Sequence, residues 1–291
     1  MPPNVAAPSD DVEGGRRAEG GRKVGGVTTS ETTRTFGEAW ASWQTARLRA
    51  ATAPYGLASL VATNWLSRSP QPLEGLPGTW RLDGGVIVGE GLSGVDDVRL
   101  AEGGELELGR LLLRHHRRDD DVALRVLDPD APSRAAVAGI DAFPPDPAWV
   151  LTGRFEPAAD GSSVDIHEID GYVESYALAG TVHLRIGGEE VALLATGARS
   201  GMQVVFSDTT SGGETYRFRF LRLRADVSNG HDGGDSGAPQ PIEVDFNRAY
   251  LPPCAFADFY LCPMPAPQNR LRVAVRAGEK TVDRPPKERA R

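Results

Sequence analysis

The sequence contains few of the residues that define several special classes of protein. Its 291 residues include 2 cysteines, 3 methionines and 5 histidines, and 7% of the residues are aromatic. Two cysteines are too few for a disulfide scaffold in a chain of this length. No run approaches the roughly 20 apolar residues of a membrane helix, and the amino terminus lacks the basic start and apolar segment of a secretory signal. We therefore expect a soluble, cytoplasmic protein with no membrane partner.

Lysine is scarce too, and acidic residues outnumber basic ones. There are 32 Lys and Arg residues against 40 Asp and Glu residues, a formal net charge of -8. Lysine occurs only at Lys23, Lys280 and Lys287, and the codon bias of a GC-rich genome explains this more simply than selection for anion-binding arginines. Because an acidic surface repels phosphate backbones, we expect no nucleic-acid partner. The composition predicts no particular oligomeric state.

Residues 1–33 differ from the rest of the chain. They are rich in Gly, Pro and charged residues and contain almost no large apolar side chains. Such a segment buries too little surface to offset the entropy that is lost on ordering, so a disordered N-terminal tail is predicted. We expect a single β-rich domain over residues 36–283 and a short basic tail over residues 284–291.

The ordered part of the chain begins with a helical pattern. Trp40, Trp43 and Leu48 recur near helical spacing, which predicts a helix over residues 38–53. Proline and glycine residues then end this helix. A second short helical turn is predicted over residues 56–66.

From residue 79 onwards, short alternating segments are separated by Gly, Asp and Pro. They predict strands at residues 79–82, 86–89, 105–108, 111–114, 122–127, 149–155, 173–177, 182–186, 191–195, 204–206, 216–224, 243–246 and 271–276. A mobile loop is predicted over residues 229–241. Because no helical segments lie between the strands, we predict a mainly β fold, an antiparallel barrel or sandwich with an N-terminal helix packed against it.

Most candidate functional residues lie between residues 208 and 280. Four carboxylates are candidates for general-acid and general-base roles: Asp208, Glu214, Asp245 and Glu279. The alternative is that these carboxylates accept backbone N–H bonds in tight turns, or pair with Arg219 and Lys280.

Six further residues are candidates for binding a ligand: Tyr216, Arg219, Asn247, Tyr250, Asn269 and Lys280. Neither face of the predicted strand 216–224 stays apolar from end to end. Either the strand runs out into solvent, or its arginines enter a polar cavity and need an anion or a carboxylate partner. We expect Arg219 and Asp245 to belong to one polar cluster.

Cysteine and histidine chemistry has weaker support. Seven residues separate Cys254 from Cys262, unlike the short spacing of most zinc sites, so packed, reduced thiols are expected. His115 and His116 lie in RHHRRDDD, a predicted charged turn. His231 lies in the predicted mobile loop, and the nucleotide-binding, hydrolase and zinc-protease motifs are missing. We expect no metal site and can name no cofactor.

Four segments resemble the signature of a bacterial and archaeal family, the domain of unknown function 1684. They are ETYRF, DFNRAYLPPCAF, LCPMPAPQNRL and AGEK. The resemblance spans roughly residues 40–280, is weaker before the last third, and implies no activity, since none is attached to the family. One departure is Ala266, which stands where the family usually has a second proline.

Two classes of function therefore stay open. In the first, the protein binds a small polar or anionic ligand in a β-lined pocket, with hydrolytic or other chemistry as an option. In the second, it is a non-catalytic structural or interaction module whose signature residues form a folding clamp. A pocket with unpaired polar groups would favour the first class, and a mutually satisfied network would favour the second.

Overall fold

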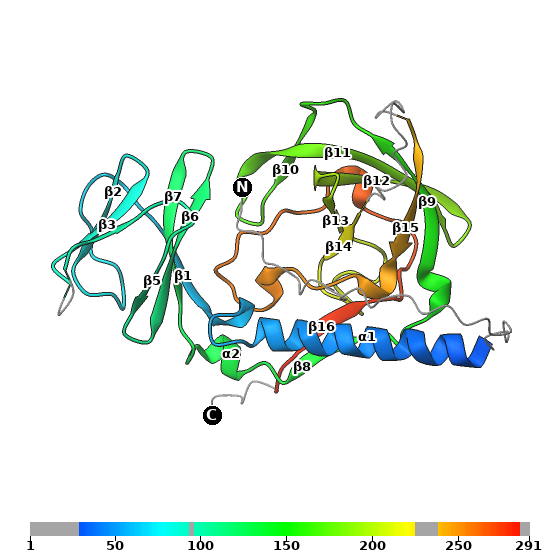
Figure 1. Ribbon diagram of the computed structural model, residues 1–291, viewed down its shortest axis with the longest axis horizontal. Helices are drawn as coiled ribbons and strands as arrows, with labels where there is room; N and C mark the ends of the chain where they lie inside the picture. The colour runs from blue at the N-terminus through cyan, green and yellow to red at the C-terminus, as the bar shows by residue number, and fades with distance from the viewer. Residues whose placement is uncertain (1–28, 93–95, 225–237, 286–291) are drawn as a thin grey trace, which may run out of the picture.

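The fold is mainly β, as predicted, with antiparallel sheets and a long N-terminal helix. The computed structural model describes residues 29–92, 96–224 and 238–285. Its largest sheet curls into a half-barrel, and the N-terminal helix packs along it (Figure 1). None of the described helices is long and apolar enough to cross a membrane.

Parts of three predicted segments lie outside the described residues. These are residues 1–28 of the tail, residues 225–237 around the loop, and residues 286–291 at the carboxyl end. The last residues of the predicted tail, 29–33, form the start of the first helix.

Helix α1 (Thr29–Ala51) corresponds to the helix that the tryptophan spacing predicts, but it begins earlier. It runs beneath the half-barrel in the view of Figure 1. The Trp40 indole Nε1 donates to the carbonyl of Asn247 at 3.0 Å, and Gln44 Nε2 donates to the carbonyl of Ile140 at 3.2 Å. Side chains on one face of α1 therefore attach the helix to later parts of the chain.

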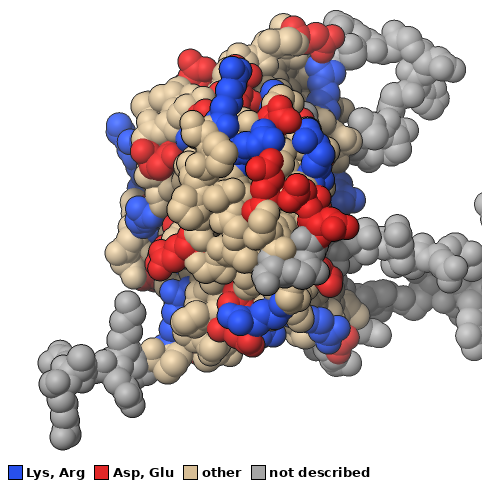
Figure 2. All heavy atoms as spheres, turned by 90° about the vertical axis from the view of Figure 1, so that its left-hand side faces the viewer, with Lys and Arg blue, Asp and Glu red and all other residues tan. Residues whose placement is uncertain are grey.

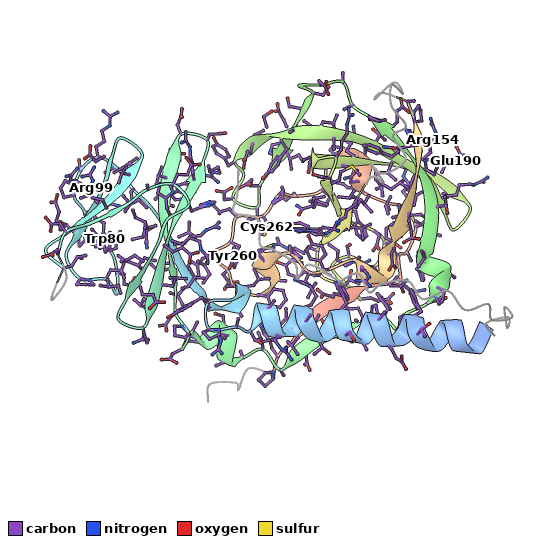
Figure 3. The ribbon with its side chains drawn as sticks, viewed as in Figure 1. Trp80, Arg99, Arg154, Glu190, Tyr260 and Cys262 are labelled. Carbon is purple, nitrogen blue, oxygen red and sulfur yellow. The ribbon has the colours of Figure 1, made fainter. Side chains whose placement is uncertain are left out.

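The N-terminal lobe, residues 57–128, contains two antiparallel sheets with the strand orders β1-β7-β6-β5 and β2-β3-β4. The strands are β1 (Leu60–Trp65), β2 (Thr79–Asp83), β3 (Val86–Glu90), β4 (Val98–Leu100), β5 (Glu105–Leu108), β6 (Leu111–Arg118) and β7 (Asp121–Leu127). Trp80 is fully buried in the hydrophobic cluster between the two sheets (Figure 3). On the face shown in Figure 2, acidic and basic side chains intermingle.

The prediction of a second helical turn at residues 56–66 is wrong. A single 3-10 turn, η1 (Leu57–Ser59), is followed by β1, which pairs with β7 from Leu60 opposite Leu127 to Trp65 opposite Ala123. The helix-like spacing was local, whereas the hydrogen bonds of β1 come from a strand about 60 residues later in the chain.

The half-barrel has the strand order β14-β13-β12-β11-β9-β15, and β10 also pairs with β11. Its strands are β9 (Val150–Pro157), β10 (Ser163–His167), β11 (Val173–Ile186), β12 (Glu189–Ala198), β13 (Gly201–Phe206), β14 (Arg219–Leu223) and β15 (Gln240–Asp245). The two strands predicted at 173–177 and 182–186 form one strand, β11, with a bulge between Leu178 and Gly180.

The remaining described elements are short. They are α2 (Pro132–Ala135), β8 (Gly139–Ala142), η2 (Pro147–Trp149), η4 (Phe246–Arg248), η5 (Pro253–Ala255), η6 (Pro267–Asn269) and β16 (Glu279–Asp283). Strand β16 pairs with β8 beside α1 (Figure 1). The half-barrel core contains Phe155, Phe206 and Phe246, each fully buried.

The predicted strand at residues 271–276 is wrong, because this segment has an irregular backbone. The amide of Val275 donates to the Asp208 carboxylate at 3.1 Å, and its carbonyl accepts from Arg219 at 2.8 Å. Side chains thus satisfy backbone groups that a neighbouring strand would otherwise have satisfied.

Candidate functional site

The centre of the signature region is a fully buried ion pair between Asp208 and Arg219. Arg219 Nη2 donates to Asp208 Oδ2 at 2.7 Å, and both side chains are 0% exposed. Arg219 also donates to the carbonyls of Val275 at 2.8 Å and Ala277 at 2.5 Å. The expected grouping of Arg219 with Asp245 is therefore wrong, because the carboxylate that neutralises Arg219 comes from the turn after β13.

Asp208 makes further hydrogen bonds within its own turn. Its Oδ1 accepts from the amide of Thr210 at 2.8 Å and from the hydroxyl of the same residue at 2.5 Å. Its Oδ2 accepts from Val275 as well as from Arg219. Both carboxylate oxygens are thus occupied by protein donors.

Glu279 is a second buried carboxylate and connects the carboxyl end to helix α1. Arg47 donates to it through Nε at 3.0 Å and through Nη2 at 3.1 Å, and the amide of Leu251 donates at 2.7 Å. The Arg47 guanidinium also lies 4.8 Å from the centre of the Tyr250 ring. No motif in the sequence indicated Arg47, because its partner lies 232 residues away.

The buried side-chain amide of Asn247 hydrogen-bonds to the backbone. It accepts from the amide of Asp146 at 2.9 Å and donates to the carbonyl of the same residue at 3.0 Å. Asp245 ends β15 and accepts from the amide of Asn247 at 2.9 Å, so these two candidates do contact each other, although Asn247 lies in η4 rather than in a strand.

Asn269 plays a similar part at the other side of the half-barrel. Its side-chain amide accepts from the amide of Leu194 at 2.8 Å and donates to the Leu194 carbonyl at 3.0 Å. It also donates to the carbonyl of Val205 at 2.9 Å. One side chain therefore provides hydrogen bonds that would otherwise require a paired strand.

Two of the remaining candidates lie at the surface, apart from the buried pair. Glu214 forms an exposed ion pair with Arg276 at 2.8 Å, and hydrogen bonding to this arginine lowers the pKa of Glu214. Lys280 forms an ion pair with Asp141 at 2.6 Å.

The two tyrosine candidates also have protein partners. The Tyr216 hydroxyl donates to the carbonyl of Cys254 at 3.1 Å, and burial raises the pKa of Tyr216 to about 12. The Tyr250 hydroxyl donates to Gln203 Oε1 at 3.4 Å. The structure therefore connects Asp208, Arg219 and Glu279 through shared contacts, but does not gather all ten candidates around one cleft.

A polar group that the sequence did not indicate lies where the N-terminal lobe meets the half-barrel. We call it the junction cluster and define it as His116, Arg118, Arg125, Glu168 and Tyr260. Tyr260 is labelled at this junction in Figure 3. His116 and Arg118 lie on β6 rather than in the predicted charged turn, because β6 stays paired with β7 up to Arg118 opposite Asp121.

Arg125 is the unusual member of the junction cluster. It is 7% exposed, and its Nε has no hydrogen-bond partner among the residues that the structure describes. Its Nη2 contacts His116 Nε2 at 3.2 Å, and its guanidinium lies 5.4 Å from the Tyr260 ring centre. Within the described ranges no carboxylate forms an ion pair with Arg125, and burial lowers its pKa.

The two side chains in direct contact with Arg125, His116 and Tyr260, are uncharged. Burial, followed by the charges of Arg125 and Arg118, lowers the pKa of His116 to about 3. The His116 Nε2 that contacts the Arg125 donor must accept, so its proton lies on Nδ1, which is buried without a partner. Burial also raises the pKa of Tyr260 to about 12, so its phenol stays neutral.

Arg118 and Glu168 are the members of the junction cluster that have partners of opposite charge. The Arg118 guanidinium lies between the rings of Trp65, at 4.5 Å, and Tyr172, at 3.9 Å. Arg118 Nη1 contacts Asp170 at 2.7 Å and Glu168 at 3.4 Å, while its Nε is buried without a partner. Burial raises the pKa of Glu168 to about 7.

Two hollows lie away from the signature residues. One hollow is lined by parts of residues 158–163, 177–179 and 197–199, and another by Arg117, residues 119–121 and Tyr172. In the portion of the chain that the structure describes, no three His, Cys, Asp or Glu side chains are grouped as a metal site would require.

These observations define a mainly β protein with a half-barrel that is closed by irregular, side-chain-bonded segments. Residues 135–280 match the family described as "Protein of unknown function (DUF1684)", about half of the chain. The chain belongs to this family. The match begins after α1 and the N-terminal lobe, and it includes both cysteines and the Asp208–Arg219 pair.

Among solved structures, the chain is similar to the solution NMR structure of the uncharacterized protein from gene locus rrnAC0354 of Haloarcula marismortui. The two share 31% identity, with a TM-score of 0.40, over 49% of this chain and 76% of that one. No curated protein matches the chain.

Proposed function

We propose that the signature residues serve a non-catalytic structural function, as a clamp that holds α1, β14 and the irregular segment 271–278 together. The observation that carries this proposal is the burial of the Asp208–Arg219 pair, in which both carboxylate oxygens and both terminal guanidinium nitrogens bond to protein groups and, among the described residues, only Arg219 Nε has no partner. A general acid or base has to reach a proton on its substrate, and neither side chain is exposed.

The clamp is tested by a double-mutant cycle with Asp208→Asn and Arg219→Met. Each single substitution leaves its partner buried without compensation, which costs about 3–5 kcal/mol of unfolding free energy for a buried pair. The double substitution is expected to cost much less than the sum of the two single costs. Urea unfolding measures all four proteins.

The exposed pair of Glu214 and Arg276 provides the matched control. Glu214→Gln should change the unfolding free energy by less than about 1 kcal/mol, because exposed ion pairs contribute little. Wild-type stability of both Asp208→Asn and Arg219→Met would contradict the clamp, and it would return these residues to the ligand-binding hypothesis.

A second function, the binding of a small anion, is favoured by Arg125. A buried guanidinium is costly unless a counter-charge and hydrogen-bond acceptors satisfy it. Arg125 Nε, Arg118 Nε and His116 Nδ1 all lack partners within the described part of the chain. We infer that an oxyanion such as phosphate or a carboxylate would be the complementary ligand for these donors.

Thermal unfolding in sodium phosphate, compared with sodium chloride at equal ionic strength, tests this second function. Phosphate should raise the melting temperature of the wild type, and Arg125→Gln should abolish the rise. Arg99→Gln, on the N-terminal lobe, is the control because Arg99 is exposed (Figure 3). An equal rise in all three proteins would show a general salt effect and overturn the anion site.

A further inference from the structure

The two signature cysteines are neighbours in space. Cys254 lies in η5 and Cys262 follows Tyr260 in the irregular segment, and both are free thiols. The amide of Cys254 donates to Cys262 Sγ at 3.3 Å, so the Cys262 sulfur lies directly against the backbone of Cys254. The seven residues between them therefore form a loop that brings Cys262 back against Cys254, a proximity that the sequence alone left open.

The two thiols have different surroundings. The Tyr216 hydroxyl lies 3.6 Å from Cys254 Sγ, and Arg217, which is exposed, donates to that hydroxyl at 3.4 Å. Hydrogen bonding to Cys262, then to Tyr216, and the charge of Arg217 lower the pKa of Cys254. A half-buried tyrosine and an exposed arginine thus connect Cys254 to the surface.

Cys262 lies deeper in the molecule. It is 2% exposed, against 7% for Cys254, and it borders the junction cluster beside Tyr260 (Figure 3). Burial raises the pKa of Cys262 well above the ordinary value of a thiol. One cysteine therefore has polar neighbours that stabilise a thiolate, and the other is a neutral thiol in contact with it.

We propose that Cys254 and Cys262 form a peroxide-reactive dithiol, in which Cys254 is the attacking thiol and Cys262 the resolving thiol. This arrangement matches what thiol oxidation requires, namely a nucleophilic thiolate and a second thiol within reach. The proposal is independent of the structural clamp and of the anion site, since it rests on the two sulfur atoms and on Tyr216.

The reaction consumes one hydroperoxide for each disulfide. The Cys254 thiolate attacks the peroxide oxygen, the O–O bond breaks, and the leaving hydroxide takes a proton to become water. The resulting sulfenic acid is attacked by the Cys262 sulfur, which loses its proton while the S–O bond breaks and a second water forms. Both sulfur atoms are oxidised, the peroxide is reduced, and an added dithiol reductant restores the two thiols.

The experiment uses the full-length protein, reduced with dithiothreitol and freed of it without air. After treatment with hydrogen peroxide, the protein is denatured with N-ethylmaleimide and its intact mass is measured. We expect the untreated protein to carry two maleimides, and the treated protein to carry none and to have lost two hydrogens. Dithiothreitol should restore both adducts. Two adducts after peroxide treatment, or a disulfide-linked dimer on a non-reducing gel, would overturn the proposal.

Four variants separate the roles of the residues. Cys262→Ser should trap Cys254 as a sulfenic acid, detected as a dimedone adduct, whereas Cys254→Ser should give none. Tyr216→Phe should slow disulfide formation several-fold, and Tyr250→Phe, whose hydroxyl contacts Gln203 instead of a sulfur atom, should not. Equal dimedone labelling of the two serine variants would reject the assigned order of attack.

Discussion

At the scale of single residues, the signature contains side chains that replace backbone partners. Asn247, Asn269 and Asp208 each hydrogen-bond to main-chain groups of distant segments, and all three are buried. Buried backbone groups need partners, and an irregular segment cannot obtain them from a neighbouring strand. These polar residues therefore allow the chain to close the half-barrel without regular secondary structure.

Gly278 provides a test of this close packing at the residue scale. Its φ is +79°, and an added Cβ would lie 2.5 Å from the carbonyl oxygen of Ala249 and 2.8 Å from that of Phe246. Gly278→Ala should therefore lower the unfolding free energy by more than the roughly 1 kcal/mol of a left-handed alanine alone.

Gly212 is the matched control, because its φ is +81° and nothing lies within 4 Å of an added Cβ. Gly212→Ala should show only the conformational cost, and urea unfolding of both variants measures the difference. Equal effects of the two substitutions would mean that the backbone near Gly278 moves aside easily.

At the scale of the elements, helix α1 depends on a contact with the opposite end of the chain. Arg47 donates twice to Glu279, which is 0% exposed in β16. A helix of modest amphipathicity is stabilised mainly by its tertiary contacts. The paired charges therefore secure α1 against the β8–β16 sheet.

Arg47→Met should be strongly destabilising, since it leaves the Glu279 carboxylate buried without its cation, at about 3–5 kcal/mol. Gln44→Ala, which removes one hydrogen bond from the same helix, should cost only about 0.5–1.5 kcal/mol. Urea unfolding gives the two free energies, and limited proteolysis near Arg49 reports detachment of the helix. Comparable costs for the two variants would show that the ion pair does not anchor α1.

At the scale of the whole molecule, the N-terminal lobe and the half-barrel meet at titratable side chains. Burial raises the pKa of Glu168 from 4.5 to about 7, and it lowers the pKa of His116 from 6.5 to about 3. The folded protein therefore buries a neutral imidazole and a carboxyl group that holds its proton near neutrality. The contact between the two parts should respond to pH.

The sign of the Glu168 effect follows from proton binding. Between pH 4.5 and about 7 the folded state keeps the Glu168 proton and the unfolded state has lost it, so this group's contribution to stability falls as the pH rises. His116 acts in the opposite direction between about pH 3 and 6.5, where the unfolded state binds the extra proton.

Urea unfolding of the wild type and of Glu168→Gln, measured at a series of pH values, separates the two contributions. The stability of the wild type relative to the variant should decrease from pH 4.5 to 7 and change little above that range. His116→Asn should remove the opposite trend at lower pH. A difference between wild type and Glu168→Gln that does not vary with pH would contradict the raised pKa.

The local alternation of apolar and polar residues was enough to predict the fold class and most of the strands. Alternating residues between Gly, Asp and Pro predicted the strands that form β2 and β3 and those that form β11 and β12, because these strands pair with near neighbours in the sequence. The signature segments likewise led to the correct family. The sequence pattern predicted the wrong structure at β1 and at residues 271–276. In both places the backbone conformation depends on hydrogen bonds to residues far along the chain.

The sequence by itself thus determined the mainly β class, the N-terminal helix, the family, and the region rich in special residues. Only the tertiary structure decided which charges pair: Asp208 with Arg219, and Glu279 with Arg47. It also brought Cys254 to Cys262 and, among the described residues, gave Arg125 no carboxylate in an ion pair. The physical reason is that the periodicity of apolar residues indicates which face of a helix or strand is buried. The pairing and the pKa of a buried charge or thiol depend instead on the groups that long-range folding places against it.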